Sequence, residues 1–181
     1  IDNEIQKADV AEKALLHSIS AELLNQYYSG NSWKFADRTK TEQKQSEDFR
    51  NWDLQTLYEK ITYHYLASLE NKIVLQSIQL EDIKDIIITA DKSKIFRPTL
   101  YDLLANRAID FFSKDFADLT QPQNAFNINN SEYFNEATSF VKQTISSEDT
   151  LSNAYWTMKI FQDLLAFRLQ QNNPEALADA D

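Results

Sequence analysis

Few residues of this sequence have the chemistry that catalysis or metal binding requires. His17 and His64 are its only two histidines, and it contains no cysteine. Glu12 and Glu59 each precede one of these histidines by five residues, whereas two ligands share a helix face at spacings of three or four. We therefore expect both histidines to be partly exposed helix residues, and we predict no metal site, thiolate nucleophile or disulfide.

The acidic residues and the scarcity of glycine also argue against an enzyme. Glu81, Asp82 and Asp85 lie together, but they lack the third and fourth ligands of a calcium loop and are typical of a solvated helix face. Gly30 is the single glycine, and phosphate-binding loops and the nucleophile elbow need several. We predict no catalytic residue and no cofactor. An enzyme that uses scattered carboxylates is the weakest alternative.

One charged pair is predicted on an otherwise apolar helix face. The face is marked by large residues at steps of three and four: Leu100, Leu103, Leu104, Phe111 and Phe112. Arg107 falls on the same face, and Asp110 follows it by three residues. A guanidinium in such a place needs a carboxylate partner, while its stem packs against apolar neighbours. We predict a structural ion pair of Arg107 with Asp110, or with a carboxylate of another helix, in preference to a catalytic role.

Trp33 is the candidate residue for contact with a partner. It lies beside the polar segment of residues 34 to 50, which is predicted to be an exposed connection. An exposed tryptophan can anchor a protein interface. The other aromatic clusters fit helix cores better.

Long helices must position these residues. A chain with one glycine lacks the residue that hairpin turns and bulges of β-proteins use. Apolar residues repeat at helical spacing over six segments, which are residues 4–29, 54–78, 80–89, 99–116, 131–145 and 149–172. The sequence therefore predicts one all-α domain over residues 1–181. We expect six or seven helices packed as antiparallel hairpins, in a right-handed array or an irregular bundle.

Two of the predicted helices have a defined core side. The stripe of the first helix is Ile5, Ala8, Ala11, Leu15, Ile19, Leu23 and Leu24. The stripe of the last long helix is Leu151, Tyr155, Met158, Phe161, Leu165 and Leu169. Thr99 and Asp102 are expected to form a capping box at the start of the helix that carries Arg107.

Composition limits the classes of partner. The net charge is −10, from 18 basic and 28 acidic residues, and nucleic-acid binding depends on phosphate neutralisation by lysine and arginine. No apolar run approaches the roughly 20 residues that a membrane-spanning helix needs. We therefore predict neither nucleic-acid binding nor a transmembrane segment, and protein is the remaining class of partner.

Both ends of the chain have the features of a fragment. Ile1 stands where an initiator methionine would, and a helical pattern starts almost at once. The final stretch "NPEALADAD" has the composition of a helix that is cut short. We expect a piece of a longer, multidomain polypeptide.

Four stretches resemble a known family: "LASLENKIVLQSIQLEDIKDIII", "RPTLYDLLANRAIDFF", "PQNAFNI" and "NPEALADAD". They are similar to the N-terminal helical region of large bacterial alpha-2-macroglobulin-like proteins, over about residues 50 to 181. The resemblance implies β-sandwich macroglobulin domains farther along the polypeptide and protease inhibition at the bacterial envelope or in the periplasm. The Cys–Gln thioester of that family has no counterpart here, because the chain has no cysteine. The implied role is a non-catalytic accessory module.

A free-standing helical scaffold is the alternative. "TLYE" at 56–59, "TLYD" at 99–102 and "TLSN" at 150–153 echo one another, although the intervals of 43 and 51 residues are irregular. A tetratricopeptide-like stack of helix hairpins would bind a peptide or protein in a concave groove.

Overall fold

The chain is almost entirely helical. A computed structural model describes residues 1–35, 48–87, 93–114 and 125–180. In these residues 68% of the structure is helix and there is no strand, which confirms the all-α prediction. They form nine α-helices, of which five have seven or more residues, against the six or seven helices expected. They also fall into two compact units, up to Glu70 and from Asn71 onward, where the sequence predicts a single domain.

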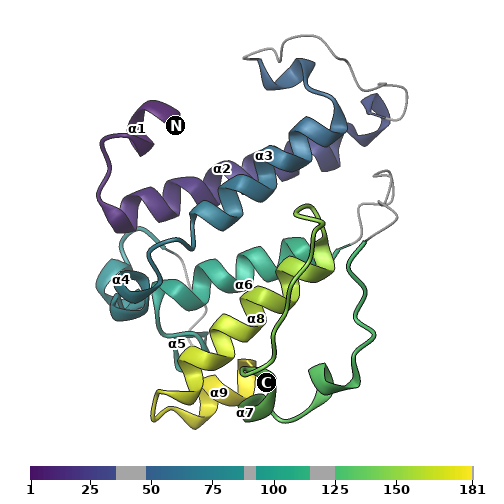
Figure 1. Cartoon of the computed structure of the whole chain (residues 1–181). Coiled ribbons are helices and arrows are strands. Elements are labelled where there is room, and N and C mark those ends of the chain that lie inside the picture. Colours follow the sequence, from purple (N-terminus) through teal and green to yellow (C-terminus); the bar gives the residue numbers. More distant parts are fainter. Residues whose placement is uncertain (36–47, 88–92, 115–124, 181) are drawn as a thin grey trace. The chain divides into compact units, whose positions relative to one another are not determined.

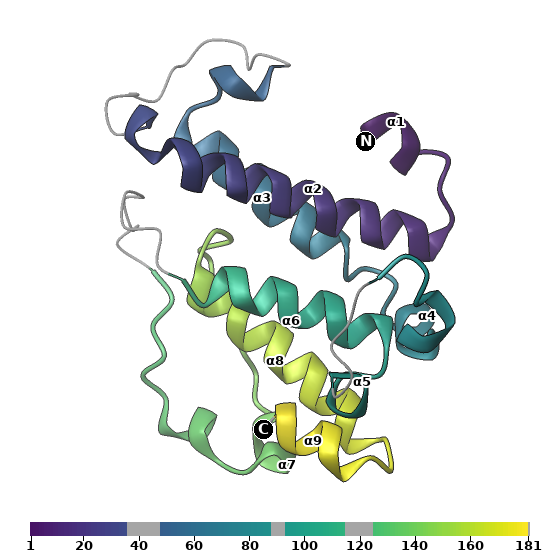
Figure 2. The same ribbon diagram turned by 180° about the vertical axis from the view of Figure 1, so that it is seen from behind.

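Unit 1 is built around one pair of long helices. Its elements are α1 (Asp2–Ile5), α2 (Val10–Asn31), a 3-10 turn (Ser32–Lys34), a second 3-10 turn (Phe49–Asn51) and α3 (Leu54–Ala67). Helices α2 and α3 lie side by side and run in opposite directions in both ribbon views (Figures 1 and 2). The hydroxyl of Tyr65 on α3 donates to Glu22 on α2 at 3.1 Å.

Local signals set the ends of these helices. Asp9 caps α2 in a capping box with Glu12, and Asp53 caps α3 by accepting from the backbone N–H of Thr56 at 2.7 Å. The helix expected over residues 54–78 ends at Ala67, and the Ser68 hydroxyl donates to a backbone carbonyl in the last turn at 2.6 Å. Such local bonds compete with helix continuation.

The buried face of α2 differs from the predicted stripe. Its buried residues are small or polar: Ala14, His17, Ser18, Ser20 and Ala21. By contrast Ile19 is 40% exposed and Leu23 is 50% exposed. On α3 the buried residues are large and include Leu57, Tyr58, Ile61 and Tyr65. Small side chains on one helix leave room for large ones on its neighbour, so in α2 size complementarity decides which face is buried.

Unit 2 contains more helices, and most of them are short. Its elements are α4 (Lys72–Ser77), a 3-10 turn (Leu80–Ile83), α5 (Ser93–Phe96), α6 (Leu100–Phe112), a 3-10 turn (Ser131–Phe134), α7 (Ala137–Phe140), α8 (Asn153–Leu169) and α9 (Pro174–Ala180). The described part of the expected helix over 80–89 contains one 3-10 turn, and the expected helix over 131–145 is replaced by two separate turns. Residues 88 and 89 lie outside the described residues. An isolated antiparallel bridge joins Gln79 to Thr99 and brings the end of α4 beside the start of α6.

Helices α6 and α8 form the second antiparallel pair. They lie side by side in both ribbon views (Figures 1 and 2). Asp102, near the start of α6, bonds Arg168, near the end of α8. At the other end, the Asn153 amide donates to the carbonyl oxygen of Lys114 at 2.6 Å. Most of the predicted apolar face of α6 is buried, with Leu100, Leu104, Phe111 and Phe112 at 2% exposure or less, while Leu103 is half-buried.

None of the described helices combines the length and the apolar character that are needed to span a membrane.

Candidate functional site

The predicted Arg107–Asp110 pair is absent from the ion pairs of the described residues. Arg107 is half-buried and Asp110 is exposed. The structure instead shows a different charged pair between α6 and α8, in which Asp102 faces Arg168. The sequence predicts a carboxylate partner for Arg107, whereas the buried ion pair of this helix involves Asp102.

The buried pair is Asp102 with Arg168. Each residue is 2% exposed, and a guanidinium N–H of Arg168 donates to Asp102 Oδ2. The same oxygen accepts the backbone N–H of Thr99 at 2.8 Å and the Thr99 hydroxyl at 2.7 Å. The predicted capping box of Thr99 and Asp102 is thus confirmed. One carboxylate both caps α6 and binds the arginine of α8.

Two polar groups near this pair have no hydrogen-bond partner in the described structure, Nε of Arg168 and the hydroxyl of Tyr101. The guanidinium lies over the ring of Phe167, with 4.5 Å to the ring centroid, an arrangement that favours a desolvated cation. Burial raises the pKa of Tyr101, and the neighbouring carboxylates Asp163 and Asp102 raise it further. Tyr101 is therefore a neutral phenol and not a nucleophile at physiological pH.

A second polar contact joins α2 to α3. The Nδ1 atoms of His17 and His64 are 2.9 Å apart. His17 is 4% exposed and His64 is half-buried, so the prediction of partly exposed histidines is wrong for His17. Burial lowers the pKa of both rings, to about 4 for His64. Both imidazoles are therefore neutral at pH 7.

Trp33 is the most exposed aromatic residue of unit 1 among those described. Its side chain is 72% exposed, and most of the connection expected over residues 34–50 lies outside the described residues. The ammonium group of Lys34 lies 5.4 Å from its ring centroid. Such an exposed aromatic ring can take part in an interface.

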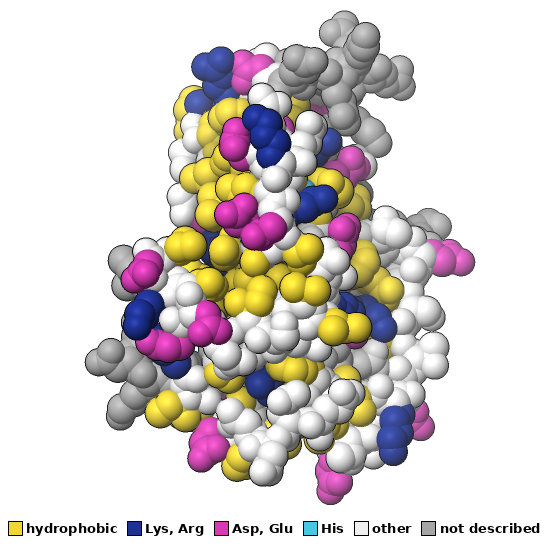
Figure 3. Space-filling view, turned by 90° about the vertical axis from the view of Figure 1, so that its left-hand side faces the viewer, with side chains coloured by type: hydrophobic (Ala, Val, Ile, Leu, Met, Phe, Trp, Pro, Cys, Tyr) yellow, Lys and Arg dark blue, Asp and Glu magenta, His cyan; other side chains and the backbone are white. Residues whose placement is uncertain are grey.

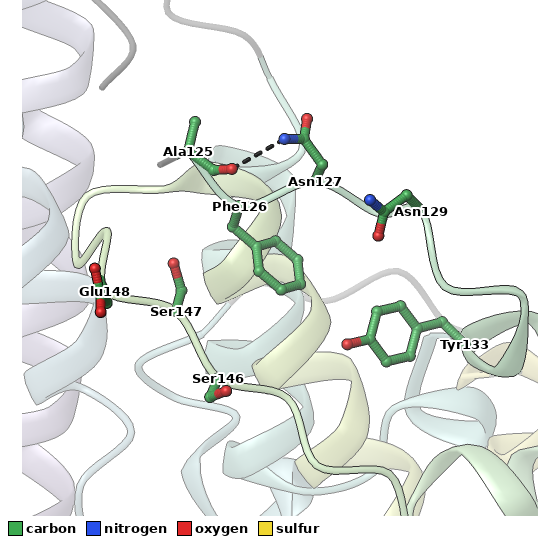
Figure 4. Close-up of a pocket in the computed structure, with 8 residues that line it drawn as sticks. All are labelled: Ala125, Phe126, Asn127, Asn129, Tyr133, Ser146, Ser147 and Glu148. Carbon is green, nitrogen blue, oxygen red and sulfur yellow. Dashed lines mark hydrogen bonds between the residues drawn. The ribbon is translucent and has the colours of Figure 1, made fainter. Parts of the chain in front are cut away.

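An open pocket of about 380 Å³ lies in unit 2. It is lined by Ala125, Phe126, Asn127, Asn129, Tyr133, Ser146, Ser147 and Glu148. The rings of Phe126 and Tyr133 face one another at 6.4 Å with an interplanar angle of 27°, beside the asparagine and serine side chains (Figure 4). The Asn127 amide is already used, since it donates to the Ala125 carbonyl at 2.9 Å. This lining offers hydrogen bonds and aromatic surface, and it brings the hydroxyl groups of Ser146 and Ser147 together with the carboxylate of Glu148.

In the described part of the chain, no three histidine or acidic side chains are grouped so that they could hold a metal ion. Acidic and basic side chains are interspersed on the face in Figure 3. A phosphate backbone requires a concentrated basic surface, which this face does not present.

Sequence reasoning missed the His17–His64 and Asp102–Arg168 contacts between helices. The two histidines are 47 residues apart and Asp102 is 66 residues from Arg168. No local spacing rule relates residues at such separations. The sequence carries one signal for the ion pair: Arg168 stands between the apolar residues Phe167 and Leu169, a position where a charge needs a partner.

No protein-family model, no curated protein and no solved structure matches this chain.

Proposed function

We propose that this chain is a non-catalytic helical module of a bacterial alpha-2-macroglobulin-like envelope protein, where it assists protease inhibition through protein contacts. Four sequence stretches within residues 66–181 carry the resemblance to that family, which covers about residues 50 to 181. The module itself would hold no cofactor and perform no step of bond cleavage. Its partner is protein, either another part of the same polypeptide or a protease.

The observation that supports a protein-contact role is the outer stripe of α2, which consists of Leu15, Ile19 and Leu23. These residues are spaced four apart and share one side of the helix. Ile19 and Leu23 are 40% and 50% exposed, while the small residues Ala14 and Ala21 are buried. A helix that buries alanine and exposes isoleucine and leucine leaves apolar surface available for association.

Protease inhibition by the whole polypeptide tests the proposal. The polypeptide that contains this chain is purified as the bacterium makes it and is mixed with trypsin. A protease inside a trap is shielded from large substrates and still reaches small ones. We expect cleavage of a protein substrate to fall while cleavage of a small chromogenic peptide continues.

Matched variants connect that activity to the outer stripe. Ile19→Asp with Leu23→Asp should reduce the inhibition without changing the helical circular dichroism spectrum, since both side chains are exposed. Gln6→Asp with Ser29→Asp introduces the same charge at exposed positions of unit 1 outside the stripe and should leave inhibition unchanged. Equal cleavage of the protein substrate with and without the polypeptide would refute the macroglobulin role.

The same experiment addresses the tetratricopeptide-like alternative. A free-standing scaffold would have no β-sandwich domains in its polypeptide and would leave trypsin active on every substrate. The length and circular dichroism of the natural polypeptide therefore separate the two proposals.

A further inference from the structure

We propose that His17 and His64 form a proton-operated clasp between α2 and α3, which holds while the two rings share at most one additional proton and opens when both are protonated. These two residues together are the His17–His64 clasp. The inference is independent of the proposed role in protease inhibition.

The geometry requires two different tautomers. The Nδ1 atoms are 2.9 Å apart, so one ring donates its Nδ1–H and the other accepts with its Nδ1 lone pair. The ring centroids are 5.1 Å apart, and the ring of Tyr63 lies edge-on to both imidazoles, at 5.8 Å from His17 and 5.2 Å from His64. The contact joins side chains 47 residues apart and thus ties one helix to the other.

Successive protons have different effects on this bond. The first additional proton can bind Nε2 of the donor ring, and the Nδ1–H still points at the neutral acceptor. The second proton must take the acceptor's Nδ1 lone pair. Two N–H groups and two positive charges would then face each other at 2.9 Å, so the hydrogen bond is lost and repulsion replaces it. The two protonation steps belong to the pair as a whole.

Some charged groups around the clasp raise the pKa of the two histidines and others lower it. Lys13 on α2 disfavours a charged His17, and Lys60 on α3 disfavours a charged His64. Asp2 on α1 favours the charged form of both rings, and Glu70, which follows α3, favours that of His17. Burial is the largest influence on each ring and opposes protonation. The balance keeps the pKa of His64 low, at about 4.

Acid should therefore destabilise unit 1. In the unfolded chain the histidines bind protons near pH 6.5, whereas in the folded chain His64 binds one only near pH 4. The unfolded state thus gains protons first as the pH falls. The stabilisation from the clasp is complete above pH 6.5 and is lost progressively toward pH 4. Protons are the ligand to which the clasp responds, since no third histidine, cysteine or acid completes a metal site among the described residues.

Urea unfolding at two pH values tests the clasp in the full chain. The chain has three tryptophans, and Trp156→Phe leaves Trp33 and Trp52, which both lie in unit 1. With EDTA present, we expect the unfolding equilibrium constant reported by these residues to rise by about 20-fold between pH 7 and pH 5, given the pKa of about 4 for His64.

The control replaces the clasp with groups that do not titrate. Asparagine places an amide near the position of Nδ1, so His17→Asn with His64→Asn keeps a polar contact between the helices. In this double variant the rise between pH 7 and pH 5 should shrink to a few-fold. An equal rise in the parent and the double variant would overturn the clasp.

A second measurement does not depend on the stability of any variant. Nuclear magnetic resonance of the parent chain follows the imidazole nitrogen shifts of both histidines with pH. We expect one ring to remain neutral until well below pH 6 and the Nδ1 shifts to show one donor and one acceptor. Two independent titrations near pH 6.5 would show that the rings do not interact, and the proposal would fail.

Discussion

The two long helix pairs bury polar groups in opposite ways. Between α2 and α3 one contact is a hydrogen bond between His17 and His64, both neutral at pH 7. Between α6 and α8 the contact is an ion pair of Asp102 and Arg168, each 2% exposed. We expect added protons to disrupt the neutral His17–His64 pair. We expect the Asp102–Arg168 ion pair to be most sensitive to a substitution that removes one of its two charges. Similar antiparallel pairs thus respond to different perturbations.

The apolar contacts of the two pairs also differ. Helix α6 buries its largest residues, including Leu104 and Phe112. Helix α2 buries alanine and serine and leaves Leu23 half exposed. Burial of large side chains gives about 1.5–3 kcal/mol each, so α6 contributes more to folding stability than α2 does. The exposed Ile19 and Leu23 of α2 remain available for association, and the proposed function rests on this difference.

The largest expected effect is the loss of the buried ion pair. Arg168→Met keeps much of the apolar stem but leaves the Asp102 carboxylate without its cation, although the bonds from Thr99 remain. Removing one partner of a buried pair costs roughly 3–5 kcal/mol. We expect a loss of this size in the free energy of unfolding of unit 2. Urea unfolding followed by Trp156, in a chain with Trp33→Phe and Trp52→Phe, measures it.

Two comparisons make this result specific. Arg97 forms an ion pair with Asp179 at 2.7 Å on partly exposed side chains, and Arg97→Met should cost less than about 1 kcal/mol. The double variant Asp102→Asn with Arg168→Met should recover part of the loss, because neither partner is then left charged and unpaired. Equal effects of Arg168→Met and Arg97→Met would mean that the pair between α6 and α8 is not desolvated.

The next effect compares leucines of the two helix pairs. Leu104 on α6 is fully buried, and Leu104→Ala should destabilise unit 2 by about 2–5 kcal/mol through lost contacts and a cavity. Leu23 on α2 is 50% exposed, and Leu23→Ala should change the stability of unit 1 by no more than about 0.5 kcal/mol. Urea unfolding followed by Trp156 measures the loss in unit 2, and unfolding followed by Trp33 and Trp52 measures the loss in unit 1. A large cost for Leu23→Ala would show that the outer stripe of α2 belongs to the folded core.

The helical class could be predicted from the sequence because it depends on local properties. A single glycine and the sustained helical spacing of apolar residues favour helices whatever the tertiary contacts of the chain are. The capping box of Thr99 and Asp102 was also predictable, since its two residues are three positions apart. The buried face of α6 followed for the same reason, as its apolar residues are concentrated on one side.

The buried faces of α2 and α8 could not be predicted in the same way. In α8 the buried residues include Ile160, Leu164 and Phe167. Of the expected stripe Leu165 is buried, whereas its other residues, among them Met158 and Phe161, are half-buried. Apolar residues occur on every side of this helix, so periodicity alone does not select one side. The selection comes from the neighbouring helix and its side-chain sizes, which lie far away in the sequence.

The polar contacts depend on tertiary structure for a further reason. Asp102 already had a local explanation as a capping residue, so nothing in its surroundings indicated a second partner. The two histidines lie on different helices, and their meeting depends on the register of α2 against α3. Electrostatic contacts of this kind become visible only when the helices are placed in space.

The smallest expected effect concerns Arg107. For the substitution of this residue, sequence and structure predict different losses in the free energy of unfolding. A buried pair with Asp110 would make Arg107→Ala cost roughly 3–5 kcal/mol. The structure shows a half-buried Arg107 outside the ion pairs of the described residues, and an exposed Asp110. We therefore expect a loss below about 1 kcal/mol, mostly from packing of the stem, so that Arg107→Met recovers most of it. Asp110→Asn should leave the stability unchanged. Urea unfolding followed by Trp156 measures all three variants, and a loss for Arg107→Ala as large as that for Arg168→Met would favour the pair predicted from the sequence.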